Sequence, residues 1–179
     1  MNTILPKILN SRKEKDTAIT IPDKEKINYL ELKNLVSEIS EKLYSFGIQS
    51  ERPIVIVLRN NAEFIISFLG VTNTSAVAAP LNPEFTDEEF NFYLDDINPS
   101  MVITSEGHSV IKQAKAKKIP TSVISFKNGS LKMDFDSEES EKKDLNKPNE
   151  KNSCLFLHTS GTTSRPKGVP LKHKNLLKS

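Results

Sequence analysis

The chain has 179 residues, enough for one ordinary domain, and its 25 basic and 23 acidic residues leave a formal net charge of +2. So small a charge gives no indication of a nucleic-acid partner, and an apolar content of 36% is low for a globular protein without indicating disorder. The single cysteine excludes an internal disulfide, and the longest apolar stretch, FIISFLGV, is too short to span a bilayer. The N-terminus lacks the apolar core of a secretory signal, so we expect a soluble cytoplasmic protein with no membrane span.

The first predicted elements are a hairpin and a long amphipathic helix. AIT and KIN flank the turn IPDKE, a pattern typical of a hairpin. In NYLELKNLVSEISEKLYSFG, Asn28 and Glu31 form a capping box and Gly47 suits the left-handed position that ends a helix. One face of this helix carries the apolar residues Leu32, Leu35, Val36, Ile39, Leu43 and Phe46.

Strands and helices then alternate. PIVIVL predicts a strand covered on both faces, and NAEFIISFLGV, which is apolar nearly all round, predicts a buried helix. AVAAPL, MVIT and TSVISF predict further strands, and HSVIKQAKAKK predicts a helix. TDEEFNFYLDDINP opens with a capping box of Thr86 and Glu89 and stops before Pro99. The alternation predicts an α/β fold with a mostly parallel sheet flanked by helices.

A charged segment interrupts this alternation. Residues 134–152 are nearly free of apolar side chains, which predicts a mobile surface loop. Since long structureless loops are unusual inside a compact domain, this segment is also a candidate tether between two subregions. CLFLHT then restores a strand.

A hydroxyl-rich stretch, LHTSGTTSRPKGVPL, is the most informative part of the chain. Gly161 permits a tight turn, and successive amides in such a turn form a concavity that holds anions. Hydroxyl donors and one mobile cation surround it. The candidate phosphate-binding residues are Thr159, Ser160, Gly161, Thr162, Thr163, Ser164 and Lys167.

Three alternatives to this interpretation are weaker. A plain polar turn would explain a shorter hydroxyl-rich run, but this run is longer and lies between two predicted strands. The P-loop pattern fails because Pro166 and Gly168 occupy its glycine and hydroxyl positions. The S-x-x-K pattern from Ser164 to Lys167 belongs on a helix, and the proline inside it disfavours one.

The motif TSGTTSRPKG resembles the phosphate loop of the adenylate-forming (AMP-binding) superfamily, with Ser164 where glycine is usual. The upstream run from IVIVLRNNAEF to DDINPSMVIT, including PLNP, and KHKNL after the loop, resemble the same family. The wording is nearest to the oxalate–CoA ligase and 4-coumarate–CoA ligase branch of acyl-CoA synthetases. The resemblance covers the chain from about residue 15 to its end.

The resemblance implies an acid–CoA ligase that joins a small carboxylic acid to AMP from ATP, releases pyrophosphate, and passes the acyl group to CoA, with Mg²⁺ on the phosphates. It implies that residues 1–179 are the first part of the large N-terminal domain, without the later catalytic segments or the C-terminal lid domain. We therefore expect a piece that is inactive alone, with no catalytic residue of its own. The alternative is a non-catalytic remnant, or one half of a split protein that binds a separate remainder. A peroxisomal signal, if the protein has one, would lie in a lost C-terminal part.

The remaining reactive side chains favour structural roles. Cys154 has no basic setting that would activate a thiol and is expected to be a buried strand residue. We expect His108 beside a helix cap, His158 in a structural position before the loop, and His173 at a helix start; their spacing predicts no metal site. The lysines at 112, 115, 117 and 118 are expected to form a solvated helix face.

Overall fold

The structure is a computed structural model that describes residues 4–22, 25–48, 50–137, 147–159 and 166–178. The helices are η1 (Leu5–Ser11, a 3-10 helix), α1 (Tyr29–Phe46), α2 (Ala62–Thr72), α3 (Asp87–Ile97), α4 (Val110–Ala116) and α5 (His173–Leu176). The strands are β1 (Thr17–Thr20), β2 (Lys26–Asn28), β3 (Pro53–Val57), β4 (Val77–Pro80), β5 (Met101–Thr104), β6 (Thr121–Lys127), β7 (Ser130–Phe135), β8 (Ser153–Thr159) and β9 (Lys167–Lys172).

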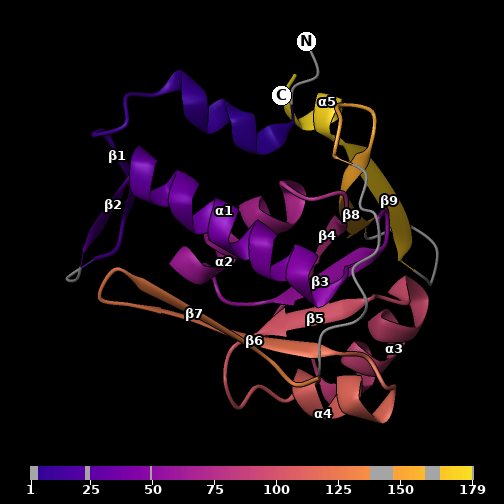
Figure 1. Cartoon of the computed structure of the whole chain (residues 1–179). Helices are drawn as coiled ribbons and strands as arrows, with labels where there is room; N and C mark the ends of the chain where they lie inside the picture. The colour runs from indigo at the N-terminus through magenta and orange to yellow at the C-terminus, as the bar shows by residue number, and fades with distance from the viewer. Residues whose placement is uncertain (1–3, 23–24, 49, 138–146, 160–165, 179) are drawn as a thin grey trace.

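One sheet of seven strands organises the molecule, in the order β7-β6-β5-β3-β4-β8-β9 (Figure 1). The inner strands β6, β5, β3, β4 and β8 are parallel to one another. Each outer strand, β7 or β9, pairs antiparallel with its neighbour. Strands β1 and β2 form a separate antiparallel hairpin. The predicted α/β fold with a mostly parallel sheet is confirmed.

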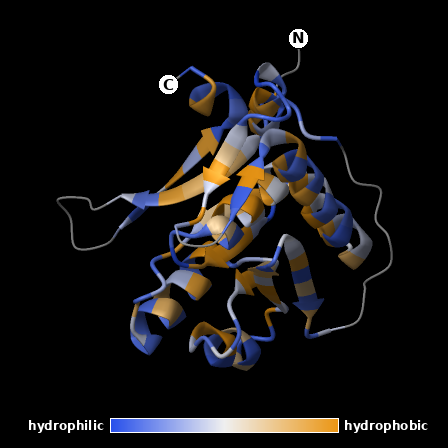
Figure 2. Cartoon of the chain, turned by 90° about the vertical axis from the view of Figure 1, so that its left-hand side faces the viewer, coloured by the Kyte–Doolittle hydropathy of each residue, from blue (hydrophilic) through white to orange (hydrophobic). Residues whose placement is uncertain are grey.

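The central strands are buried on both faces, as their continuous apolar sequences predict. Ile54 and Ile56 of β3 point into a core with α1 and α2, whereas Val55 and Val57 point into a second core with α3 and α4. Figure 2 shows the hydrophobic residues concentrated on the strands in the middle of the molecule. The helices thus cover both faces of one sheet.

The local sequence signals for helix ends are confirmed. Both capping boxes form: Asn28 with Glu31 at the start of α1, and Thr86 with Glu89 at the start of α3. Gly47 ends α1 in the left-handed conformation, with φ of 84°. Within the described residues, no helix has both the length and the apolar character needed to cross a membrane.

Strand β7, like the 3-10 helix η1, is an element that the sequence analysis missed. It follows β6 through a two-residue turn in which Asn128 and Gly129 both have positive φ, 50° and 72°. Asn-Gly is a strong signal for this hairpin turn, so the sequence contained the information. Asp134 and Phe135, predicted to begin the charged loop, are therefore the end of a strand. Residues 138–146 of that loop lie outside the described residues.

Helix α2 is less buried than predicted. Its side facing α1 and the sheet is buried, but Ile65 is 37% exposed and Phe64 is half-buried. The prediction was wrong on this side because an apolar helix sequence does not reveal whether the fold supplies a cover for every face.

The N-terminal segment packs beside the last helix of the chain (Figure 1). The backbone N–H of Leu5 donates a hydrogen bond of 3.0 Å to Nδ1 of His173, the first residue of α5. Ile4, Pro6 and Leu9 are buried in this region. The two ends of the described chain are thereby joined.

Candidate functional site

The hydroxyl-rich stretch begins in β8 and ends in β9, two strands that pair antiparallel. Thr159, the last residue of β8, is paired across the strands with Lys167, the first residue of β9. The Thr159 hydroxyl donates a hydrogen bond of 3.4 Å to the Lys167 carbonyl. The other predicted binding residues, Ser160, Gly161, Thr162, Thr163 and Ser164, lie outside the described residues. The structure therefore brings together the two ends of the predicted loop.

Lys167 begins a strand, not a helix. This excludes the P-loop, in which a helix starts at the lysine, and the helical S-x-x-K motif. Its side chain is exposed, and no carboxylate of the described residues lies within ion-pair distance of its ammonium group. The ammonium group is therefore available to an anion.

The ring of Phe156, on β8, lies directly over Gly168, on β9. A Cβ atom added at Gly168 would collide with the Phe156 ring, whose Cε1 and Cε2 atoms would both lie 3.0 Å away. Glycine is thus required here by the close approach of a neighbouring ring, not by its backbone angles. No sequence pattern signals this contact.

His158 connects the hairpin to α3. Its Nε2 lies 2.8 Å from Oδ2 of Asp96, and its ring packs edge-on against Tyr93, with centroids 4.8 Å apart. The Phe156 ring also packs edge-on against the imidazole, with centroids 5.3 Å apart. These partners support the expected structural role, since they fix the ring against a helix.

Thr159, at the carboxyl end of β8, lies at the edge of the sheet where parallel strands of α/β proteins end in ligand-binding loops. Strands β3, β4, β5 and β8 run parallel, so the segments that follow them meet at one edge. The strand order reverses between β3 and β5, and a crevice of about 400 Å³ opens there beside Arg59, Glu84 and His108. The crevice and the described end of β8 therefore both lie at the carboxyl ends of these parallel strands.

Polar contacts line this crevice. Nη2 of Arg59 lies 3.1 Å from Oε1 of Glu84, and because both side chains are exposed the pair contributes little to stability. His108 accepts a hydrogen bond from the Val110 N–H at Nδ1, which leaves Nε2 to donate to the Pro83 carbonyl at 3.0 Å. His108 is thus the helix-cap neighbour that the sequence predicted.

Cys154 and His173 are buried, and burial favours the uncharged form of each side chain. Burial raises the pKa of the Cys154 thiol to about 11, which keeps it protonated, and lowers the pKa of His173 to about 4, which keeps it neutral. Among the residues that the structure describes, no three His, Cys, Asp or Glu side chains cluster in a way that would hold a metal ion. Lys112, Lys115 and Lys118 are exposed, while Lys117 pairs with Asp95 at 2.6 Å.

Comparisons with known proteins identify relatives along nearly the whole chain. A family model described as AMP-binding enzyme matches residues 9–179. An oxalate–CoA ligase of Arabidopsis thaliana is 38% identical in an alignment 171 residues long that covers 90% of this chain and 33% of that protein. A probable CoA ligase of Humulus lupulus, CCL9, is 33% identical in an alignment 171 residues long that covers 90% of this chain and 32% of that protein.

A solved structure shows the same fold. ATP-bound MatB from Rhodopseudomonas palustris superposes with a TM-score of 0.80 at 22% identity, over 99% of this chain and 36% of that one. The chain spans about a third of the length of the curated relatives it matches. Since the family model covers almost every residue, the chain belongs to the AMP-binding enzyme family, whose members similar to it include CoA ligases.

Proposed function

We propose that the chain is the ATP phosphate-binding part of an acid–CoA ligase. In the proposed reaction a carboxylate oxygen attacks the α-phosphorus of ATP, the bond to the β-phosphate breaks, and pyrophosphate leaves. The CoA thiol then loses its proton and attacks the acyl carbon, and AMP leaves. The observation that carries the proposal is the pairing of Thr159 with Lys167, which brings the two ends of the hydroxyl-rich stretch together at the carboxyl end of β8.

The loop would act electrostatically on the leaving pyrophosphate. The hydroxyls of Ser160, Thr162, Thr163 and Ser164 would donate to phosphate oxygens, that of Thr159 would do so in place of its bond to the Lys167 carbonyl, and Gly161 would permit the backbone amides to approach an anion. The Lys167 ammonium adds a positive charge. Each hydrogen bond to a charged oxygen contributes roughly 1.5–3 kcal/mol, so three or four such bonds would steady the developing charge.

Mg²⁺ would enter with the phosphates, because it prefers phosphate oxygens and usually binds proteins together with them. The two described ends of the stretch suit a polyphosphate: Thr159 carries a hydroxyl, and the Lys167 side chain is exposed, with no carboxylate of the described residues within ion-pair distance. CoA, the acyl group and most of ATP would be bound by a further part of the enzyme, joined to this chain or associated with it.

Oxalate is the first carboxylic acid to test. The proposal rests on the names of two relatives, the Arabidopsis protein and an oxalate–CoA ligase of Saccharomyces cerevisiae that is 28% identical over 199 residues. In an enzyme that contains this chain together with the further part described above, ATP–pyrophosphate exchange measured with oxalate and a panel of other small acids would identify the substrate. We expect no robust exchange by residues 1–179 alone; robust turnover would show that the remaining two thirds of the relatives' length are dispensable.

Lys167→Ala tests the loop directly. We expect residues 1–179 to bind tripolyphosphate weakly, and the substitution to weaken this binding about tenfold, as measured by titration calorimetry. Lys174→Ala, an exposed lysine on α5, is the matched control and should leave binding unchanged. The unfolding transition of the Lys167 variant should match that of the unaltered chain. Unchanged phosphate binding, or loss of folding, would contradict the proposed role.

A further inference from the structure

An apolar pair of residues is left uncovered on one side of the β8–β9 hairpin. Phe156 and His158 of β8 pack toward α3, so the alternation of side chains along a strand turns Leu157 to the other side, where α1 and α2 lie. Val169 of β9 is paired directly with Leu157 and therefore faces the same way. Leu157 is 38% exposed, and neither Leu157 nor Val169 packs against either hydrophobic core.

Little of the chain remains that could cover this pair. Strand β4 is paired with β8 through Ala78 and Leu155, two residues before Leu157, and β9 is the outer strand of the sheet. The segments outside the described residues contain only two large apolar residues, Met1 and Leu145. The apolar surface of the pair therefore calls for a cover from another polypeptide segment.

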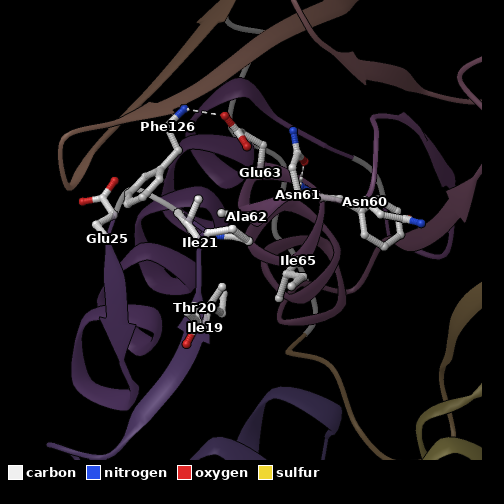
Figure 3. A pocket seen from close by; sticks show the side chains of 12 residues that line it. Ile19, Thr20, Ile21, Glu25, Asn60, Asn61, Ala62, Glu63, Ile65 and Phe126 are labelled. Carbon is white, nitrogen blue, oxygen red and sulfur yellow. Dashed lines mark hydrogen bonds between the residues drawn. The ribbon is translucent and has the colours of Figure 1, made fainter.

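The same side of the sheet is uncovered at a second place. Ile65, near the start of α2, is 37% exposed. Together with Ile21 and Phe126, it lines a pocket of about 560 Å³ between α2 and the β1–β2 hairpin (Figure 3). The start of α2 and the end of β8 both lie toward the carboxyl edge of the parallel strands. Uncovered apolar surface that gathers on one side of a molecule marks an interaction site.

The uncovered pair adjoins the proposed phosphate-binding residues. On the same face, the next cross-strand pair after Leu157 and Val169 is Thr159 with Lys167. Residues two positions apart in a strand are separated by about 7 Å, so a body resting on the apolar pair would stand beside the phosphates. The chain spans about a third of the length of the curated relatives it matches, and the proposed reaction requires a further part to bind the acyl group and most of ATP.

The charge of the hairpin disfavours a second copy of the chain as the cover. Residues 151–179 contain no acidic residue and six basic ones, namely Lys151, Arg165, Lys167, Lys172, Lys174 and Lys178. Two copies of this hairpin would therefore bring like charges together. Pro170, in the outer strand β9, also lacks the N–H that an added strand would need. These features fit a partner surface with an apolar centre and an acidic rim.

We propose that this side of the molecule, with Leu157 and Val169 at its centre, is the surface on which the further part of the enzyme packs. The inference rests on the proposed function, because it is the proposed reaction that requires such a part. Packing would bury the apolar pair and bring the groups that bind the acyl chain and the adenine next to Lys167.

One double substitution, studied in two settings, tests the proposal. Residues 1–179 are examined alone and in a chimera, in which they replace the matching third of the Arabidopsis oxalate–CoA ligase. Leu157→Thr/Val169→Thr removes apolar surface and keeps residue types that favour strands. We expect it to lower the melting temperature of the chimera by roughly 4 °C or more, and that of the isolated chain by much less, because only the chimera covers the pair.

Phe92→Gln is the matched control, because the Phe92 ring is 40% exposed on α3, at the other side of the sheet. It should have the same effect in both settings. Three results would overturn the proposal: equal effects of the double variant in the two settings, a chimera that does not fold, or a dimer of the isolated chain that the double variant disrupts.

ATP–pyrophosphate exchange by the chimera, measured with oxalate and other small acids, tests the proposed function separately. A chimera that is stabilised through Leu157 and Val169 but inactive with every acid would contradict the ligase function and leave the packing surface in place. Exchange that persists in a chimera whose stability ignores both residues would contradict the packing surface alone.

Discussion

At Gly168 a single hydrogen atom faces the ring of Phe156, which stands on the paired strand β8. The contact lies next to Lys167, where the stretch that carries the candidate phosphate ligands ends. The side chain at position 168 is therefore restricted by packing, even though the residue itself is exposed.

We expect Gly168→Ala to destabilise the protein by about 1–3 kcal/mol, the usual cost of forcing extra volume into a packed site. The free energy of unfolding in urea measures this. Phe156→Leu removes the colliding ring atoms, so adding Gly168→Ala to that variant should cost much less than adding it to the unaltered chain. Additive costs in the double-mutant cycle would mean that the ring does not set the restriction.

Cys154 provides a pH-dependent prediction at the same scale. Burial raises the pKa of its thiol from about 9 to about 11, so the folded protein favours the protonated form. The stabilisation is present below pH 9 and declines as the pH rises from about 9 to about 11. We expect negligible alkylation by iodoacetamide at pH 8 in the folded protein and rapid alkylation in urea. Fast labelling of folded protein would contradict the burial.

At the scale of elements, His173 joins η1 to α5. Its Nδ1 accepts the Leu5 N–H at 3.0 Å, which requires an unprotonated nitrogen, and its buried Nε2 has no hydrogen-bond partner among the described residues. Protonation would place a charge in this apolar contact and a second hydrogen opposite the Leu5 N–H. The N-terminal segment should therefore detach when this histidine is protonated.

The direction of the expected pH effect follows from the lowered pKa of His173. Burial lowers the pKa of His173 from 6.5 to about 4, so the neutral form is favoured by folding. This stabilisation is complete above pH 6.5 and is lost as the pH falls through 4, by up to roughly 3 kcal/mol. His173→Asn retains an acceptor near Nδ1 but does not titrate. The unaltered protein should lose more unfolding free energy between pH 7 and 4 than this variant; equal losses would assign the acid effect to carboxylates.

Local signals in the sequence were sufficient for most elements. The capping boxes at Asn28 and Thr86 and the apolar run of β3 each depend on residues a few positions apart, so the sequence predicts them. The strands on either side of the hydroxyl-rich stretch were predictable for the same reason. In contrast, the Asp96–His158 contact joins residues 62 positions apart, and the uncovered side of α2 depends on where the β1–β2 hairpin lies. Both are consequences of the assembled fold.

At the scale of the whole molecule, one sheet separates two cores. Alternate residues of the same strands belong to opposite cores: Ile56 to the one beneath α1 and α2, and Val55 to the one beneath α3 and α4. Because neither core can lose its strands without exposing the other, the two faces should unfold together. The charged segment before β8 does not divide them, since β8 pairs with β4 in the same sheet.

Two reporter variants test this cooperativity, which is straightforward because the chain has no tryptophan. Tyr44→Trp places a fluorophore on α1, and Phe92→Trp places one on α3, where the native ring is 40% exposed. We expect coincident urea transitions from both reporters. Adding Ile56→Val, which should cost about 1 kcal/mol at a site in only one core, should move both midpoints by the same amount. A shift confined to the α1 reporter, or two separate transitions, would show that the faces are independent units.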